Sequence, residues 1–385
     1  MRWAGLPRLH FAVLACCAAA VALAGCGSTT TNNQAVTVDG KMLTIYASQP
    51  PGAQTAVDAD VLDAEKLALQ QAGSKTGRYT LQLRVVHRAT VSAAARAAIS
   101  DKTAIAYLGE IQPGTSGAST QINNELGLLQ ISPTDTAVYL TQPTPAVPGS
   151  PQHWFPAHGN FGRTFARVVP NTAKEAKAIV SEIGSLHRTK LFVASDAGSY
   201  GRSAALEVRQ DAAAAGISVV SSAAGADAVF YAGEPGQAAT KAVDTAASAS
   251  RRADVFVPSA LYDAEWVHGL SATVQQRLYV SAPGFMPGQY KGTGPHFVSA
   301  FRSMFHRRPQ PQAVFGYAAM QALLAGLQQA GANANSRADV TKDVRGLKDQ
   351  HSALGTYTLD GGDTNIAPFI FARPVAGSLV PRVAG

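Results

Sequence analysis

The segment between residues 105 and 136 constrains the fold more than any other part of the chain. It reads as a short strand that ends at Gly109, a polar turn, a helix that begins near Thr115, and a second strand that ends at Ile131. A unit of this length predicts two parallel strands joined by a crossover helix. Both strands end in hydroxyl-rich turns at the carboxyl edge of the expected sheet. In open α/β sheets, small ligands bind at this edge.

Alternating strand and helix patterns extend on both sides of this unit. One series covers residues 43–140, and a second begins at residue 172 after a stretch, residues 141–162, in which prolines are closely spaced. Prolines at that spacing do not fit a helix or an interior strand, so this stretch is predicted to be a surface excursion. The pattern predicts an α/β protein with two doubly wound lobes, each built on a mostly parallel sheet.

The amino terminus has the organisation of an export signal. A basic start precedes an apolar stretch, residues 9–24, which leads to the sequence Leu-Ala-Gly-Cys ending at Cys26. This closely resembles the lipobox of bacterial lipoproteins, in which the cysteine carries lipid. The resemblance implies a signal peptide over residues 1–25 and a lipid anchor on the extracytoplasmic face of the cell membrane. An ordinary signal peptide or a buried helix is the alternative, since about sixteen apolar residues is short for a transmembrane helix.

Composition argues against several classes of protein. Cys16 and Cys17 lie in the predicted signal peptide, so no cysteine remains for a disulfide or a thiolate metal site. The formal charge of +7 is dispersed, and its densest basic groups lack interleaved aromatic residues, which argues against nucleic-acid binding. Residues 26–40 are typical of a flexible tether. No nucleophile, phosphate-loop or dinucleotide motif is present, so neither an enzyme nor a cofactor is predicted.

Five motifs together indicate a family. They are Gly109 with Ile131-Ser132-Pro133, residues 165–171, Ser199-Tyr200-Gly201, residues 315–320, and Gly355-Thr356-Tyr357 with residues 360–363. Their order and spacing resemble the type I periplasmic solute-binding proteins, in the Leu/Ile/Val-binding branch that serves ABC importers. The resemblance implies two lobes joined by three hinge crossovers. One lobe would comprise residues 41–165 and 283–355, and the other residues 166–282 and 356–385.

This resemblance implies a function. The protein would capture a small polar solute, an amino acid or a related molecule, between its lobes and deliver it to the permease subunits of an ABC importer. Hinge closure would complete the hydrogen bonds of the solute and remove it from water. The alternative is a ligand-sensing or regulatory lipoprotein that acts on a non-transporter partner, because fold alone does not separate these roles.

In the first lobe, the resemblance implies ligand contacts from the turns at residues 112–116 and 132–136. Family members use these positions to hold the carboxylate or the ammonium of an amino acid. The predicted residues are Gln112, Thr115, Ser116, Ser132, Thr134 and Thr136. Amides at a helix start favour an anion. Alternatively, Thr115 or Ser116 only caps a helix, and Ser132 only belongs to a turn.

In the second lobe, the predicted contacts are Tyr200, Glu234, Ser259 and Asp263. Tyr200 matches an aromatic residue that faces the ligand in the family. Two positions differ from the Leu/Ile/Val binders. Ser259 stands where that branch has an acidic residue that pairs with the ligand ammonium, and Glu234 falls near a position that is usually aromatic. Asp263 and Glu265 are candidate replacements for the missing charge, and the alternative for Glu265 is a solvated residue in the first turn of a helix.

Overall fold

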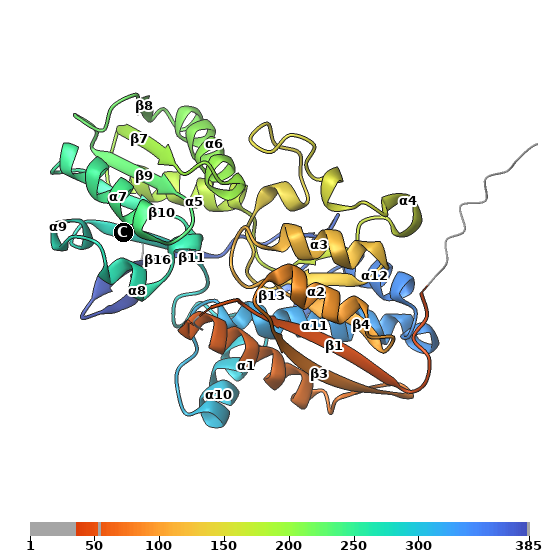
Figure 1. Cartoon of the computed structure of the whole chain (residues 1–385). Coiled ribbons are helices and arrows are strands. Elements are labelled where there is room, and N and C mark those ends of the chain that lie inside the picture. The colour runs from red at the N-terminus through yellow and green to blue at the C-terminus, as the bar shows by residue number, and fades with distance from the viewer. Residues whose placement is uncertain (1–35, 53–54, 383–385) are drawn as a thin grey trace, which may run out of the picture. The chain divides into compact units, whose positions relative to one another are not determined.

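The computed structural model describes residues 36–52 and 55–382, which form two α/β lobes (Figure 1). Cys26, the predicted signal peptide and most of the predicted tether lie outside the described residues. The predicted fold class, two doubly wound lobes, is confirmed by the two sheets of the structure. Within the described residues, no helix has both the length and the apolar character needed to cross a bilayer.

The first lobe is built on a six-stranded sheet in which only the β2–β3 pair is antiparallel. In spatial order its strands are β2 (Lys75–Thr76), β3 (Tyr79–His87), β1 (Met42–Gln49), β4 (Ala104–Leu108), β5 (Leu129–Ser132) and β6 (Phe165–Arg167). Its helices are α1 (Ala56–Gln71), α2 (Val91–Ile99), α3 (Ser116–Glu125), α10 (Gly294–Phe305), α11 (Ala313–Ala330) and α12 (Arg337–Arg345).

Helices cover both faces of this sheet because successive strand side chains point in opposite directions. On β1, Ile45 belongs to the apolar core formed with α1 and α11, and Tyr46 belongs to the core beneath α2. Helices α1 and α11 approach closely at Gly316, where a Cβ atom would lie 2.4 Å from the Val61 carbonyl oxygen. The first sheet is therefore buried on both sides, and its strand ends are left for other roles.

The second lobe is built on a seven-stranded sheet in which β16 runs antiparallel to both of its neighbours. In spatial order its strands are β17 (Ser378–Arg382), β16 (Phe369–Val375), β11 (Leu278–Pro283), β10 (Asp254–Val257), β9 (Ala228–Ala232), β7 (Lys190–Ser195) and β8 (Ser218–Val220). Its helices are α5 (Thr172–Ser185), α6 (Ser199–Ala214), α7 (Gln237–Ala249), α8 (Ala264–His268) and α9 (Ala272–Gln275). On β10, Phe256 packs with the α5 and α6 core and Val255 with the α7 core.

Shorter elements connect these parts. The predicted surface excursion at residues 141–162 contains only η2 (Gln152–Trp154) and α4 (His158–Phe161). The remaining elements are η1 (Val138–Leu140), η3 (Ser259–Leu261), η4 (Gly331–Asn333), β12 (Gln350–Ser352), β13 (Gly355–Tyr357), β14 (Leu359–Asp360) and β15 (Asp363–Thr364).

Three crossovers join the lobes, after β6, after β11 and before β16. The third differs from the boundary at residues 355 and 356 that we predicted, because Tyr357 and Leu359 are buried in the core of the first lobe. The turn between β14 and β15 is bound to β6, since the Arg167 amide donates to the Gly362 carbonyl oxygen at 2.8 Å. The chain therefore returns to the second lobe only beyond residue 364.

Candidate functional site

Asp135 organises the turns that follow β4 and β5 in the first lobe. Its Oδ1 accepts hydrogen bonds from the amides of Gly114 at 2.7 Å and Ala137 at 3.0 Å. Its Oδ2 accepts one from the Ser116 amide at 2.8 Å. Ser116 opens α3, so the buried Asp135 carboxylate occupies the amides at the positive end of that helix. Sequence analysis did not single out this residue, although a carboxylate in the turn beside a helix start is the signal for it.

Two of the predicted hydroxyls in these turns are fully buried and bind the backbone. The Ser132 hydroxyl donates to the Glu110 carbonyl oxygen and accepts from the Asp135 amide, each at 2.8 Å. The Ser116 hydroxyl accepts from the Glu110 amide at 3.1 Å. These contacts correspond to the alternative given above, in which such residues shape a turn.

Glu175, in the first turn of α5, is a buried carboxylate that binds residues at the strand ends of the second lobe. Its carboxylate accepts hydrogen bonds from the Ser259 amide at 2.7 Å, the Ser259 hydroxyl at 3.1 Å and the Tyr200 hydroxyl at 3.5 Å, and another from Ser281. Burial raises the pKa of Glu175, although these hydrogen bonds act in the opposite direction. Sequence analysis missed Glu175 because a position on a helix does not indicate that its side chain reaches strand ends elsewhere in the chain.

The two lobes touch beside these carboxylates. The Thr136 hydroxyl lies 3.3 Å from the Tyr200 hydroxyl and 3.4 Å from that of Ser259. Gly114, whose φ is +88°, allows the approach, because a Cβ atom there would lie 2.9 Å from the Tyr200 Cβ. Thr136 and Tyr200 are 0% and 3% exposed, so this part of the junction is filled by protein side chains.

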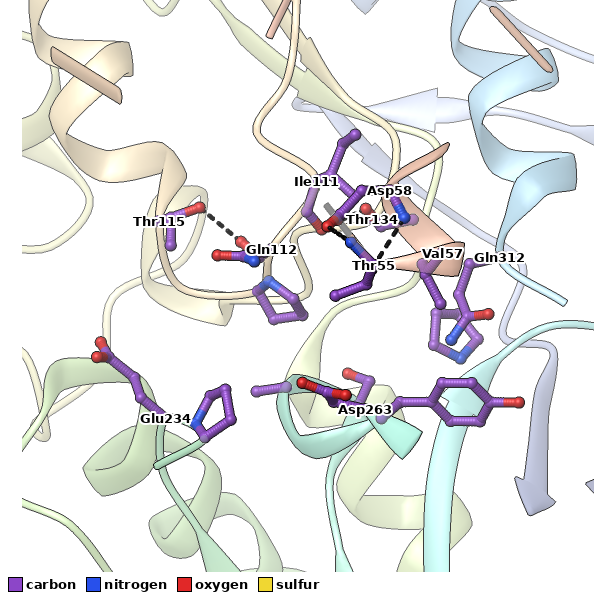
Figure 2. A pocket seen from close by; sticks show the side chains of 16 residues that line it. Thr55, Val57, Asp58, Ile111, Gln112, Thr115, Thr134, Glu234, Asp263 and Gln312 are labelled. Carbon is purple, nitrogen blue, oxygen red and sulfur yellow. Dashed lines mark hydrogen bonds between the residues drawn. The ribbon is translucent and has the colours of Figure 1, made fainter. Parts of the chain in front are cut away.

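A cavity of about 270 Å³ lies next to this contact, and both lobes contribute to its wall (Figure 2). Six of the predicted site residues line it, namely Gln112, Thr115, Thr134, Glu234, Ser259 and Asp263. Four do not, namely Ser116, Ser132, Thr136 and Tyr200. Among the lining residues that we did not predict are Thr55, Asp58, Tyr262, Pro283 and Gln312.

The start of α1 brings Asp58 to the cavity. Thr55 and Asp58 form a capping box, in which the Asp58 amide donates to the Thr55 hydroxyl at 3.1 Å and the Thr55 amide donates to the Asp58 carboxylate at 2.9 Å. A Thr followed three residues later by an acidic residue is the sequence signal for this motif. Asp58 is 2% exposed, and burial is the main cause of its raised pKa.

The opposite wall carries Asp263 and Glu234 (Figure 2). Asp263 caps α8 by accepting hydrogen bonds from the Glu265 amide at 2.8 Å and the Trp266 amide at 3.4 Å. Burial is the largest cause of the raised pKa of Asp58, and the hydrogen bonds from Thr55 lower it. The negative charge of Asp263 raises the pKa of Asp58 further. The Glu234 side chain is exposed at the cavity rim.

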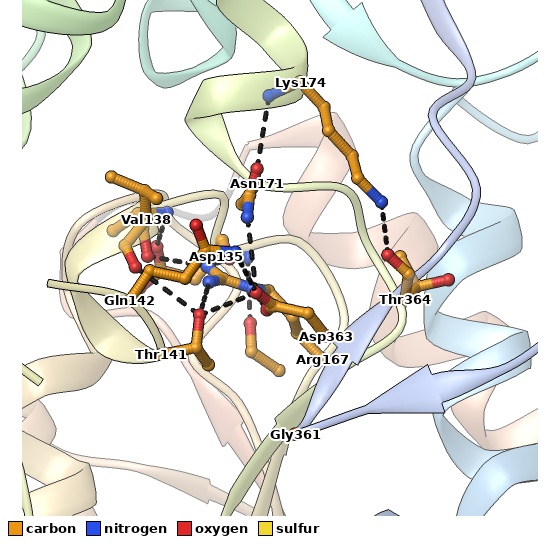
Figure 3. A network of polar contacts seen from close by, with 12 residues as sticks. Asp135, Val138, Thr141, Gln142, Arg167, Asn171, Lys174, Gly361, Asp363 and Thr364 are labelled. Atoms are coloured by element: carbon orange, nitrogen blue, oxygen red, sulfur yellow. Dashed lines mark hydrogen bonds and ion pairs between the residues drawn. The ribbon is translucent and has the colours of Figure 1, made fainter.

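A polar network joins the first and third crossovers (Figure 3). The fully buried Arg167 guanidinium lies 2.6 Å from Asp363 and also donates to the Ala137 carbonyl oxygen at 2.6 Å. Asp363 accepts further hydrogen bonds from Thr141 at 2.8 Å and Asn171 at 3.3 Å. Burial opposes its ionisation, but the adjacent Arg167 charge lowers the pKa of Asp363. The network holds the first and third crossovers against each other.

Histidine, cysteine and carboxylate side chains of the described residues form no group of three or more that could hold a metal ion. The cavity is lined by hydroxyl, amide and carboxylate side chains, largely from turns at the carboxyl edges of both sheets.

Several solved structures share this architecture. A leucine-binding protein, LivK, from Thermotoga maritima superposes with a TM-score of 0.72 at 16% identity, over 89% of this chain and 98% of that chain. An ABC transporter substrate-binding protein from Desulfitobacterium hafniense, in complex with Leu, gives 0.69 at 19% identity, over 89% and 100%. LivJ from Streptococcus pneumoniae, in complex with isoleucine, gives 0.67 at 14%, over 89% and 100%. At these identities the likeness establishes the type I periplasmic binding fold.

No curated protein matches the sequence significantly. The sequence model of the periplasmic binding protein family, in contrast, matches residues 51–377, which include both sheets except β1 and β17, all three crossovers and the residues that line the cavity. The chain therefore belongs to the periplasmic binding protein family.

Proposed function

We propose that this protein binds a small polar solute in the interlobe cavity and delivers it to the membrane subunits of an ABC importer. The observation that carries the proposal is the position of the cavity. Its wall combines the strand-end turns of both sheets, from Thr134 in the first lobe to Ser259 in the second. A solute in this position contacts both lobes, so it favours the closed arrangement over an open one.

The size of the cavity supports a small solute. Its volume of about 270 Å³ is close to the lower end of the range of about 300–1,000 Å³ found for ligand pockets. The lining mixes apolar groups such as Val57 and Pro283 with polar ones such as Gln112 and Gln312. The role proposed here is binding without turnover, so a bound solute is expected to be recovered chemically unchanged.

A thermal-shift screen of the purified protein against amino acids, amides, polyamines and small acids tests the proposal. A solute at about 100 times its Kd adds about 2.7 kcal/mol to the free energy of unfolding. Ala260 lines the cavity, so Ala260→Phe is expected to fill it and abolish the shift. The matched control is Ala249→Phe, at an exposed position near the end of α7. Normal solute binding by Ala260→Phe would contradict the site.

We also propose that lipid on Cys26 holds the protein at the outer face of the cell membrane. The proposal rests on the lipobox-like sequence that ends at this residue. Cys26→Ser is expected to move the protein from the membrane fraction to the soluble extracytoplasmic fraction. Retention of the variant in the membrane fraction would contradict lipid anchoring at this position.

Uptake measurements separate delivery from sensing. Cells that lack this chain are expected to accumulate the bound solute more slowly, and reintroduction of the intact chain is expected to restore uptake. The Ala260→Phe variant is expected not to restore it. Unchanged uptake in the deletion strain would instead favour a sensing role.

A further inference from the structure

The cavity is acidic in a protein of positive net charge. Its charged lining residues are Asp58, Glu234 and Asp263, and no Lys, Arg or His of the described residues lines it. The whole chain has a formal charge of +7. Among the ion pairs of the described residues, none involves any of these three carboxylates. Asp58 is buried, Asp263 half-buried and Glu234 exposed. Buried carboxylates are normally paired, so Asp58 in particular lacks the cationic partner that its burial calls for.

Two unpartnered polar atoms add an independent observation. The Gln312 Oε1 and the Tyr262 hydroxyl are buried without a hydrogen-bond partner, and both residues line the cavity. The residues are 4% and 8% exposed, so bulk water does not supply the missing bond. Figure 2 shows the Gln312 side chain extending toward the cavity beside Val57. Buried polar groups are satisfied in the great majority of cases, so the Gln312 side chain points to a missing ligand.

Three hydroxyls of the cavity lining already donate their hydrogens to protein acceptors. The Thr115 hydroxyl donates to the Gln112 carbonyl oxygen at 2.7 Å, and the Thr134 hydroxyl donates to that of Ile111. The Ser259 hydroxyl donates to the Glu175 carboxylate at 3.1 Å. Each hydroxyl carries a single hydrogen, so these groups offer the cavity only lone pairs.

The backbone amides at the start of α3 do not replace these donors. Asp135 already accepts hydrogen bonds from the amides of Gly114 and Ser116. A solute carboxylate would meet three like charges and no basic side chain, at a cost in desolvation and repulsion. An ammonium group, in contrast, would supply up to three hydrogens to this set of acceptors.

We infer that the solute is a small organic amine without a carboxylate, and that its ammonium group binds between Asp58 and Asp263. The Gln312 side chain provides a further polar contact in the same cavity. This inference rests on the proposed solute-binding function and specifies its ligand. An organic cation fits better than a metal ion, because the described residues include no group of three or more metal-ligating side chains.

An ammonium group between Asp58 and Asp263 would also make closure of the lobes depend on the ligand. Asp58 belongs to the first lobe and Asp263 to the second, so closing the lobes brings two negative charges together. In the closed arrangement, burial and then the charge of Asp263 raise the pKa of Asp58. An ammonium group between them converts this repulsion into two attractions and stabilises the closed form.

Matched solutes test the inference by isothermal titration calorimetry with the purified protein. Leucine and 3-methylbutylamine differ only in the α-carboxylate. The pair 1,4-diaminobutane and succinate offers four-carbon molecules with cationic or anionic ends. Each amine is expected to bind tighter than its carboxylate-bearing counterpart by on the order of 10-fold or more. Leucine or succinate binding as tightly as the matched amine overturns the inference.

Failure of this inference and failure of the proposed function give different results. Binding of leucine or succinate without binding of either amine overturns the ligand class and leaves solute binding intact. A response to no solute in the set, nor to any in the wider screen, overturns both.

The variant Asp263→Asn then tests whether Asp263 binds the ammonium group. Asparagine caps a helix as well as aspartate, so α8 is expected to persist. The tighter of the two amines is expected to lose affinity by on the order of 10-fold. Glu125→Gln is the control, because it removes one exposed carboxylate at the far end of α3 and is expected to leave affinity unchanged. Unchanged amine affinity in Asp263→Asn overturns the assignment.

Discussion

Glu110, a buried carboxyl group at the end of β4, is expected to make the stability of the first lobe depend on pH. Its side chain is 1% exposed and accepts hydrogen bonds from the Tyr107 hydroxyl at 2.7 Å and the Ser48 hydroxyl at 2.6 Å. Burial raises the pKa of Glu110 from 4.5 to about 7, against the hydrogen bonds, which lower it. The folded protein therefore binds this proton at pH values where the unfolded chain has released it.

The sign and size follow from linkage. Between pH 4.5 and about 7 the folded state holds more protons than the unfolded state at this residue, so the free energy of unfolding falls as pH rises. The fall ends once pH passes the folded-state pKa. A difference of about 2.5 pKa units corresponds to about 3 kcal/mol, of which about 2.5 kcal/mol is expected between pH 5 and pH 8.

Urea unfolding of the wild type and Glu110→Gln at pH 5 and pH 8 measures this contribution. Glutamine is neutral at both pH values, so the variant is expected to gain about 2–3 kcal/mol relative to the wild type as pH rises. Other titrating groups are common to both proteins and cancel in the comparison. Glu125→Gln, an exposed site, controls for the loss of charge. An equal pH dependence in wild type and Glu110→Gln would refute the reasoning.

Two further substitutions test the packing of the hinge and the first lobe. Arg167→Met removes the fully buried partner of the half-buried Asp363 carboxylate, which is expected to lower the free energy of unfolding by about 3 kcal/mol in urea. A loss below about 1 kcal/mol would contradict a structural role for the pair. Gly316→Ala would place its Cβ atom 2.4 Å from the Val61 carbonyl oxygen, at an expected cost of about 1–3 kcal/mol. The control, Gly184→Ala in α5, meets no atom within 4 Å and is expected to stabilise by about 0.5–1 kcal/mol; equal effects of the two alanines would contradict close helix packing.

Local sequence patterns predicted the two sheets because their causes are local. Alternating burial along a strand and the spacing of apolar residues along a helix depend on neighbours within a few positions. The family resemblance placed the third crossover too early, at residues 355 and 356, because nothing in the sequence near Gly361 and Gly362 shows which strand they bind. Their actual partner is the backbone of β6, from which Arg167 donates to Gly362. A contact between residues so far apart in the chain has no local signal.

The sequence alone was sufficient to predict a two-lobed α/β chain and to place hydroxyl-rich turns such as residues 132–136 at the carboxyl edges of its sheets. It did not reveal that Asp135 occupies the amides of α3. The sequence also did not show that Asp58, Asp263 and Gln312 line one cavity. Each residue comes from a different part of the chain, and each has an ordinary local position near the end of a helix. Only the packing of the lobes brings these acceptors into one cavity, because charge and hydrogen bonding depend on distance in space and not along the chain.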